Sequence, residues 1–213
     1  IGEAGIVLNA GEDGVMEFVT TGRALRLNGA VVLQSDASID TSDRGNEAGA
    51  EIRFTRDATI DSASGESNGL TFTAGTDGAV SFNADIGSTA ALGWLIVTDA
   101  WGVSFGNDVS GADPDLSPLT TVRVNGNAAF PPTDYALDIG SLTPIGDGGI
   151  ALNGGAGSTL SLVTTADRVR MNGIVELQSD VWIDTSDAGT ASGAEIRFTQ
   201  IATIDSEPGE ANG

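Results

Sequence analysis

The stretch LQSDASIDTSDRGNEAGAEIRFT at residues 33–55 returns at residues 177–199 as LQSDVWIDTSDAGTASGAEIRFT. The offset is 144 residues, and the match extends outward without a gap until residues 1–69 lie over residues 145–213, with 40 of 69 positions identical. Independent domains rarely keep their length so strictly, because surface loops tolerate insertions at little cost. A fixed period therefore predicts a repeat architecture in which each unit is one structural step.

The period also predicts the domain organisation. Residues 1–144 form a first full repeat unit, and residues 145–213 form the first half of a second unit. We expect one continuous rod without a linker, in which residues 111–144, with several prolines, form a looser, looped segment. Because both ends fall within a unit, we expect the chain to be part of a longer repeat protein.

Composition limits the classes of partner and chemistry. The net charge is −21, from 30 acidic residues and nine cations, and the pI is about 4.1. This charge argues against nucleic acid and anionic membrane surfaces as partners, because both require a basic footprint. The absence of cysteine excludes disulfides, thiol catalysis and cysteine-ligated zinc. The longest apolar run, AALGWLIV at residues 90–97, is far shorter than the ~18 residues of a membrane-spanning segment.

Alternation of apolar and polar residues predicts an all-β fold. Examples are LRL at 25–27, IRF at 52–54, LTF at 70–72 and VRV at 122–124, separated by Gly, Asn, Asp and Ser clusters typical of turns. Two architectures compete: tandem Ig-like sandwiches with hairpins, and a β-solenoid whose coils stack on one another. The recurrence of Asn-Gly after apolar-x-apolar segments favours the solenoid, because both residues adopt left-handed dihedrals at its corners.

Seven apolar positions suggest the size of a coil. If Leu8, Leu27, Phe54, Phe72, Val97, Val124 and Leu152 are equivalent inward positions, the 144-residue unit holds about six coils averaging 24 residues. With strands about 4.8 Å apart, one unit would then extend a rod by about 29 Å.

The sequence also resembles a known family. The phrases TTGRALRLNGAVVLQSDASIDT (20–41), AEIRFTRDATIDS (50–62), LTFTAGTDGAVSFNADIG (70–87) and LGWLIVTDAWGVSFGNDVS (92–110) resemble repeats of filamentous haemagglutinin-like bacterial surface proteins. The likeness covers residues 20–110 and 164–213. It implies a right-handed parallel β-helix exported to the bacterial cell surface or secreted, with a role in adhesion, aggregation or biofilm formation.

Paired carboxylates are the candidates for catalysis, because β-helical polysaccharide hydrolases and lyases use such pairs. The pairs are Asp40 with Asp43, Asp113 with Asp115, and Asp134 with Asp138. Aspartates in Ser- and Gly-rich clusters are more often turn residues that cap their own backbone. The first pair also recurs at the 144-residue offset, which an active site has no reason to do. We therefore assign no catalytic, cofactor-binding or metal-binding residue and expect no enzyme.

Calcium and carbohydrate are the remaining ligand hypotheses. The acidic loops at 40–47 and 107–115 offer the oxygen ligands that calcium prefers, but the calcium-binding nonapeptide is absent. Trp94, Trp101 and Trp182 would be carbohydrate-stacking platforms if exposed, although packing within the coils is the favoured interpretation. Trp182 stands where the first unit has Ser38, so we expect that position to point outward.

The sequence thus predicts a structural rod segment of a bacterial extracellular fibre or adhesin. Its expected partners are adjacent repeat units, like chains end-to-end or laterally, and cell-surface glycans or receptors. The alternative function is a carbohydrate-active or carbohydrate-binding β-helix.

Overall fold

The fold consists of strands, turns and bends. The computed structural model describes residues 5–11, 14–106, 119–125, 133–155, 157–199, 201–206 and 212–213, and these residues contain eighteen strands and no helix. Within the same ranges there is accordingly no helix with the length and apolarity to span a membrane. The predicted all-β class is confirmed.

The strands lie on three faces, and the pairings between described strands are all parallel. Face I holds β1 (Ile6–Leu8), β4 (Val31–Leu33), β7 (Ile60–Ser62), β10 (Thr121–Val124), β13 (Thr159–Thr164) and β16 (Asp180–Asp184). Face II holds β2 (Val15–Val19), β5 (Asp36–Asp40), β11 (Leu137–Ile139), β14 (Val169–Met171) and β17 (Ile196–Phe198). Face III holds β3 (Leu25–Leu27), β6 (Ile52–Phe54), β12 (Gly149–Leu152), β15 (Val175–Leu177) and β18 (Ile204–Ser206).

Two long strands join faces II and III. β8 (Leu70–Phe82) and β9 (Leu95–Phe105) begin on face II and end on face III, with register shifts between residues 72 and 79 where they bend. They merge both faces into one twelve-stranded sheet, while face I consists of two three-stranded sheets. Ile86 connects those two, because it bridges in parallel to Ile60 on one side and to Val122 on the other.

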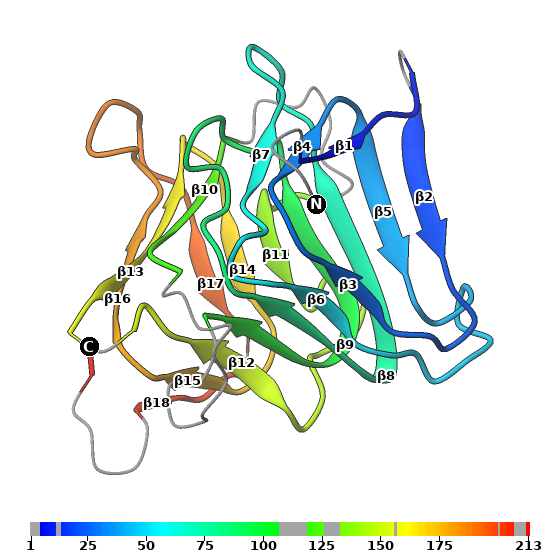
Figure 1. The fold of residues 1–213 in the computed structure, drawn as a ribbon. Helices are drawn as coiled ribbons and strands as arrows, with labels where there is room; N and C mark the ends of the chain where they lie inside the picture. The colour runs from blue at the N-terminus through cyan, green and yellow to red at the C-terminus, as the bar shows by residue number, and fades with distance from the viewer. Residues whose placement is uncertain are drawn as a thin grey trace.

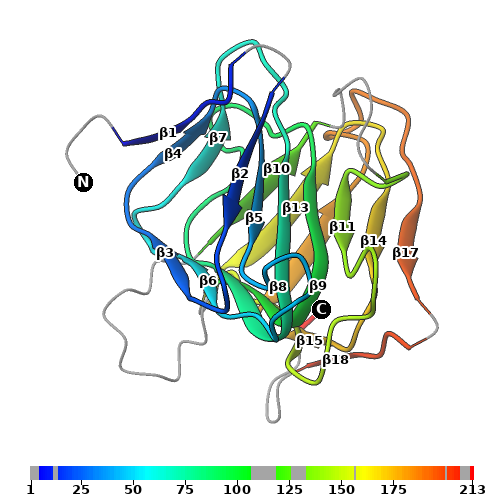
Figure 2. The ribbon, with the colours of Figure 1, turned by 90° about the vertical axis from the view of Figure 1, so that its right-hand side faces the viewer.

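The chain visits faces I, II and III in that order, seven times. Figure 1 shows the face II strands in the sequence β2, β5, β8, β9, β11, β14 and β17 from one end of the molecule to the other. Figure 2 shows the three faces enclosing a common interior, with β1, β2 and β3 at one end. Parallel partners are therefore one circuit apart in the chain, which hairpins cannot produce.

The core fills the space between the three faces. Apolar residues at alternate strand positions point inward, so each circuit packs on the inward side chains of the circuits before and after it. The largest of these side chains form a column in which Phe82 lies 5.5 Å from Phe54, 5.4 Å from Phe72 and 5.2 Å from Phe105 between ring centroids. All four are at most 1% exposed. Stacking of like circuits thus forms the core.

The prediction of six coils per unit is wrong. Leu27 does pair with Phe54 on face III, and Phe72 does pair with Val97 on face II, so those steps are single circuits. The step from Phe54 to Phe72 instead passes from face III to face II. Apolar alternation marks which residues point inward, but it does not say to which face they belong.

The pairings give a different length for the repeat. From β1 to its copy β12, 144 residues later, the chain passes fourteen faces, which at three faces per circuit is four and two-thirds circuits. One circuit therefore averages about 31 residues, and one unit occupies about 22 Å of axis at a strand spacing of ~4.8 Å. Because the count is not a whole number of circuits, the second unit is turned by one third of a circuit relative to the first.

This rotation places identical sequences on different faces. β3 lies on face III and its copy β14 on face II, and β5 lies on face II and its copy β16 on face I. Local contacts nevertheless recur, because Thr55 Oγ1 donates to Asn28 Oδ1 at 2.8 Å and Thr199 Oγ1 donates to Asn172 Oδ1 at the same distance. Local sequence determines the shape of each corner, and the number of faces crossed determines on which face that corner lies.

Candidate functional site

The predicted loop at residues 111–144 falls partly on strands. β10 and β11 lie within it, while residues 107–118 and 126–132 lie outside the described part of the chain. Asp113, Asp115 and the acidic loop at 107–115 are therefore among the undescribed residues. The described part brings together a polar cluster on the outer side of face II, which we call the Asp138 cluster: Tyr135, Asp138, Arg170, Glu195 and Arg197.

An ion pair between adjacent circuits forms the centre of the Asp138 cluster. Asp138 of β11 pairs in register with Arg170 of β14, which in turn pairs with Arg197 of β17. The Arg170 guanidinium donates from Nε to Asp138 Oδ1 at 2.7 Å and from Nη2 to Oδ2 at 2.8 Å. Nη2 also donates to the carbonyl oxygen of Ser141 at 3.1 Å. Asp138 is fully buried although it points outward, so this bidentate bond compensates the charge of a carboxylate removed from water.

Tyr135 extends the cluster to a third circuit. Its ring lies over the Arg170 guanidinium, 4.8 Å from the centroid to Cζ, and its hydroxyl lies 3.5 Å from Glu195 Oε2. Arg197 Nη1 donates to the same hydroxyl at 3.4 Å, and this contact raises the pKa of Arg197. The cation–π contact and the two long hydrogen bonds join β11, β14 and β17 on their outer side.

The electrostatics of the cluster indicate a structural tie between circuits. Burial raises the pKa of the Asp138 carboxyl, and hydrogen bonds from Arg170 and Thr133 oppose that rise. Both carboxylate oxygens already accept from one guanidinium, so this geometry leaves Asp138 poorly placed as a general base. Asp134 is exposed while Asp138 is buried, so the pair suggested by the sequence does not share an environment.

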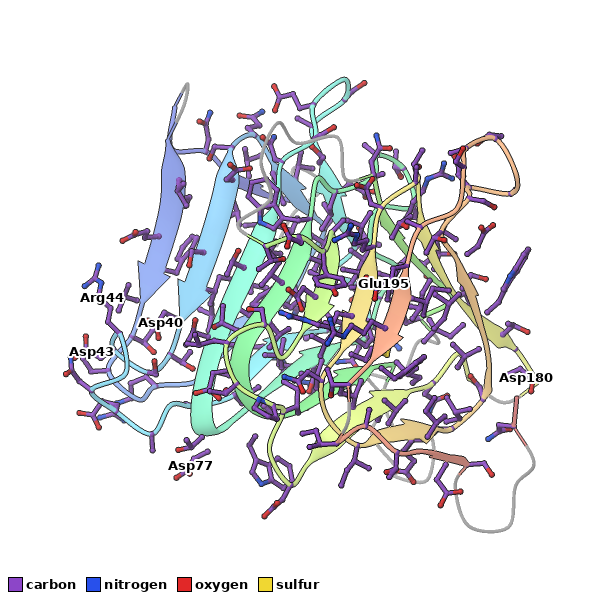
Figure 3. All side chains as sticks on the ribbon, turned by 180° about the vertical axis from the view of Figure 1, so that it is seen from behind. Asp40, Asp43, Arg44, Asp77, Asp180 and Glu195 are labelled. Atoms are coloured by element: carbon purple, nitrogen blue, oxygen red, sulfur yellow. The ribbon has the colours of Figure 1, made fainter. Side chains whose placement is uncertain are left out.

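Asp40 and Asp43 form a turn. Asp40 Oδ1 accepts from the backbone nitrogen and the hydroxyl of Ser42, both at 2.7 Å, and Oδ2 accepts from the nitrogen of Arg44 at 2.9 Å. Asp43 and Arg44 have positive φ angles of 50° and 55°, conformations in which these hydrogen bonds hold the backbone. Figure 3 shows Asp40, Asp43 and Arg44 together near the end of the molecule that carries β2.

The copy of this turn has the same internal bonds and a different neighbour. Asp184 Oδ1 accepts from the nitrogen and hydroxyl of Ser186 at 2.7 Å, and these bonds lower the pKa of Asp184. Asp187, the copy of Asp43, accepts from Arg123 Nη2 at 2.8 Å on face I. The one-third rotation thus gives identical turns different surroundings on different faces.

The structure bears on the calcium hypothesis only where it is described. In the described ranges, including the loop at 40–47, no three Asp, Glu, His or Cys side chains lie close enough to hold a metal ion. A polar hollow of about 830 Å³ is lined by Asn9, Gln34, Ser35, Asp36, Glu66 and Asn68. Several of these residues bond to one another, including Asn9 Nδ2 to Gln34 Oε1 at 2.9 Å and Asn68 Nδ2 to Glu66 Oε2 at 2.6 Å. The polar side chains that line the hollow are therefore hydrogen-bonded to one another at this corner of the fold.

The three tryptophans differ in exposure. Trp94 is 7% exposed, and its indole nitrogen donates to Thr71 Oγ1 at 3.3 Å, so it packs as the sequence suggested. Trp101 is 48% exposed on β9, although its ring lies against Gly148. Trp182 is 59% exposed, which confirms that it points outward.

Apolar side chains are exposed in the first and last circuits that the structure describes. Ile196 and Ile204 in the last circuit are 42% and 50% exposed, whereas their first-unit copies Ile52 and Ile60 are fully buried. Val7 in the first circuit is 50% exposed. These ends present apolar side chains together with parallel strands that have a neighbour on one side. The repeat had indicated this, because strand edges at the end of a stack are covered by the next unit.

Comparison with known proteins identifies no relative: no protein-family model, no curated protein and no solved structure matches this chain.

Proposed function

We propose that the chain is a segment of a right-handed parallel β-solenoid and forms the rod of a bacterial cell-surface or extracellular fibre. Its role is mechanical: it extends, holds and presents surfaces for adhesion, aggregation or biofilm formation. The handedness follows the strong right-handed preference of parallel crossover connections. The filamentous haemagglutinin-like phrases support the same arrangement and the extracellular location.

One observation carries the proposal: each circuit buries its apolar face only against the circuits next to it. Phe82 contacts phenylalanines of the circuits before and after its own. A stack of this kind can continue for as many units as the sequence repeats, and its length grows linearly. Length is the property that a fibre requires.

Charge and chemistry fit this role. A net charge of −21 keeps such rods apart laterally in solution, because like charges repel at low ionic strength. The ionic contacts described above link circuits to one another: Arg170 to Asp138, and Arg123 to Asp187. We assign no reaction to the chain.

Tandem chains test the proposal. One, two and three copies of residues 1–144, each followed by residues 145–213, should give unbranched rods by negative-stain electron microscopy. Each added unit should lengthen the rod by about 22 Å, from four and two-thirds circuits at ~4.8 Å. Beads on a string would contradict the proposal, and an increment near 29 Å would contradict the circuit count.

A carbohydrate-binding rod is the second candidate, favoured by the exposure of Trp101 and Trp182. Exposed indole rings stack on sugar faces. Titration of a panel of neutral and anionic glycans, with Trp101→Ala and Trp182→Ala as controls, separates the candidates. Glycan binding that both substitutions weaken would support the carbohydrate-binding role. No binding to any glycan of the panel would support the mechanical role.

A further inference from the structure

A groove crosses the corner between faces II and III in the interior of the stack. The connections from β5 to β6 and from β11 to β12 leave the sheet over residues 41–51 and 140–148, whereas β8 and β9 bend round the same corner as continuous strands. β8 and β9 lie between β5 and β11 on face II, so the two connections form walls on either side of their bends (Figure 1). The walls are three strand spacings apart, about 14 Å. β2 and β14 flank the four strands, so the groove lies among circuits that have neighbours on both sides.

The groove has the size of a small-molecule site. Its volume is about 650 Å³, within the ~300–1,000 Å³ of ligand pockets in general. We call it the corner groove, and its lining includes Arg44 and Glu47 of the first wall, Thr73, Thr98 and Asp99 of the floor, and Leu142 of the second wall. The Leu142 side chain is 79% exposed, so the groove combines apolar surface with a few polar groups, as ligand sites do.

Both walls are fixed to the floor by hydrogen bonds. The nitrogen of Asp77 donates to the carbonyl oxygen of Ala48 at 2.9 Å, and the nitrogen of Leu142 donates to that of Thr98 at 3.1 Å. Thr143 Oγ1 donates to Asp99 Oδ1 at 2.8 Å. The corner groove is therefore preformed, and a ligand does not have to order it.

The hydroxyl protons in the corner groove are already used within the protein. Thr98 Oγ1 donates to the carbonyl oxygen of Phe72 at 2.9 Å, so its single proton is taken. The 2.6 Å contact between the hydroxyls of Thr73 and Thr98 is then a donation from Thr73. Ser42 Oγ likewise donates to Asp40 Oδ1. These hydroxyls offer lone pairs to a ligand, so the ligand must supply the hydrogen-bond donors.

Charge points to the same chemistry. Asp99 uses one carboxylate oxygen for Thr143, and Glu47 is exposed on the first wall. The guanidinium of Arg44 pairs with Glu17 Oε2 at 3.1 Å. Acceptors and negative charge therefore predominate among these polar groups. They favour a ligand with hydroxyl or ammonium groups and disfavour one with a carboxylate or a sulfate.

An indole ring lies beside the floor of the corner groove. Trp101 follows Asp99 on β9 by two residues, with the buried Ala100 between them, so both side chains lie on the outer side about 7 Å apart along the strand. A Cβ on Gly148 would lie 2.5, 2.6 and 2.9 Å from Cε3, Cζ3 and Cδ2 of the indole. Such similar distances to three ring atoms place Gly148 over one face of the ring. The side chain is 48% exposed, so the opposite face is open to a ligand.

Gly148 is specific to this copy of the repeat. The first unit has Ala4 at the equivalent position, 144 residues earlier. A Cβ at position 148 would come within 2.5 Å of the indole, so the ring of Trp101 would have to move away from the wall. The glycine thus holds the open face of the indole in place beside the groove.

We propose that the corner groove binds an oligosaccharide without acidic groups. One sugar ring stacks on Trp101, and its hydroxyl or ammonium groups donate to Asp99 and to Thr73, the register partner of Asp99 on β8. A sugar ring has an apolar face and hydroxyl donors at its edge, which match the open indole face and the acceptors beside it. The proposal rests on the carbohydrate-binding candidate of the proposed function and gives that role a site and a ligand class.

Isothermal titration calorimetry of the purified chain with three trisaccharides tests the proposal, at about pH 6, where amino groups are charged. We expect binding of the glucosamine trimer, weaker binding of the uncharged maltotriose, and no binding of the galacturonic acid trimer. Trp101→Ala should weaken binding at least about tenfold, because the stacking surface is lost. Thr73→Val removes an acceptor at nearly constant shape and should weaken binding about fivefold.

Gly148→Ala tests the position of the indole. It introduces the residue that the first unit carries and should weaken binding as much as Trp101→Ala does, although the binding side chains are all present. It should also shift the tryptophan emission. In the Trp101→Ala background it should do neither, which separates an effect on the indole from a general loss of structure.

Ile174→Ala is the matched control, because it removes a similarly exposed apolar side chain from a corner outside the groove and should leave binding unchanged. Circular dichroism verifies that each variant is folded. An affinity for the galacturonic acid trimer or for trilysine that equals the affinity for the glucosamine trimer would overturn the ligand class. Binding that survives Trp101→Ala would overturn the site, even where Trp182→Ala weakens it and the carbohydrate-binding role stands. No binding of any trisaccharide would overturn the site and that role together, whereas the lengths of tandem rods test the mechanical role independently.

Discussion

Phe54 and Phe198 occupy the same position in two copies of the phrase AEIRFT, so they isolate the contribution of a neighbouring circuit. Phe54 is 1% exposed, and its ring centroid lies 5.7 Å from that of Phe72 and 5.5 Å from that of Phe82. Phe198 is half-buried and belongs to the last circuit. Local sequence is the same, while the cover, the face and the preceding strand partner (Leu27 for Phe54, Met171 for Phe198) differ.

The two substitutions should therefore differ in their cost. Phe54→Ala removes a fully buried ring and leaves a cavity, which lowers the free energy of unfolding by about 3–5 kcal/mol. Phe198→Ala removes a ring that water already reaches on one side, and half of the ~1.5–3 kcal/mol for burying such a side chain gives about 1 kcal/mol. The expected difference is at least about 2 kcal/mol.

Urea denaturation followed by tryptophan fluorescence measures this difference, at a concentration low enough to keep the chains apart. At a slope of ~3 kcal/mol per molar urea, Phe54→Ala should lower the midpoint by about 1 M or more. Phe198→Ala should lower it by about a third of that. Equal effects of the two substitutions would refute the reasoning, because they would mean that the circuit above Phe54 contributes nothing.

Three further predictions follow from the same contacts. Gly49→Ala should lower the free energy of unfolding by about 3 kcal/mol, because a Cβ there would lie 1.7 Å from the carbonyl oxygen of Ala74 in the next circuit. Gly193→Ala, at the copy of this position, should lower it by less than about 0.5 kcal/mol. Thermal unfolding of both variants compares the two effects. The lowered pKa of Asp184 contributes stability that is present above the carboxyl's ordinary pKa and is lost as pH falls through the lowered pKa. Asp184→Asn should therefore flatten the fall in melting temperature over the acidic range below that ordinary pKa. Asp138→Asn should lower the urea-derived free energy of unfolding by about 3 kcal/mol, because its arginine partner is left in a mostly buried site; no loss would contradict the role of the ion pair.

Sequence reasoning reached the strand class, the period and the inward residues. These depend on local alternation and on an exact count between copies, both of which are visible in LRL, IRF and LTF and in the 144-residue offset. The predicted number of circuits was wrong because the apolar pattern marks both Phe54 and Phe72 as inward and was taken to place them on the same face of successive circuits. Their assignment to faces III and II depends on the bend within β8 and on partners a whole circuit away.

The Asp138 cluster was only partly predictable. Asp138 was a candidate, but Arg170 is 32 positions later, a separation that means contact only once the length of that circuit is known. The single tyrosine gave no signal of its own, because its ring reaches Arg170 from a bend before β11. Asp40 shows the opposite case, since its partners lie two and four residues away and local turn chemistry predicted them.

Disulfide cross-linking tests the stacking of circuits most directly, because the chain has no cysteine of its own. Ser81 and Ser104 are register partners on neighbouring circuits of face III, while Thr71 lies on face II. Strands about 4.8 Å apart fall within the ~4.4–6.8 Å that a disulfide needs between Cα atoms. The account predicts rapid oxidation within one chain for Ser81→Cys with Ser104→Cys, and none for Thr71→Cys with Ser104→Cys. Cross-linking of the second pair without the first would contradict it.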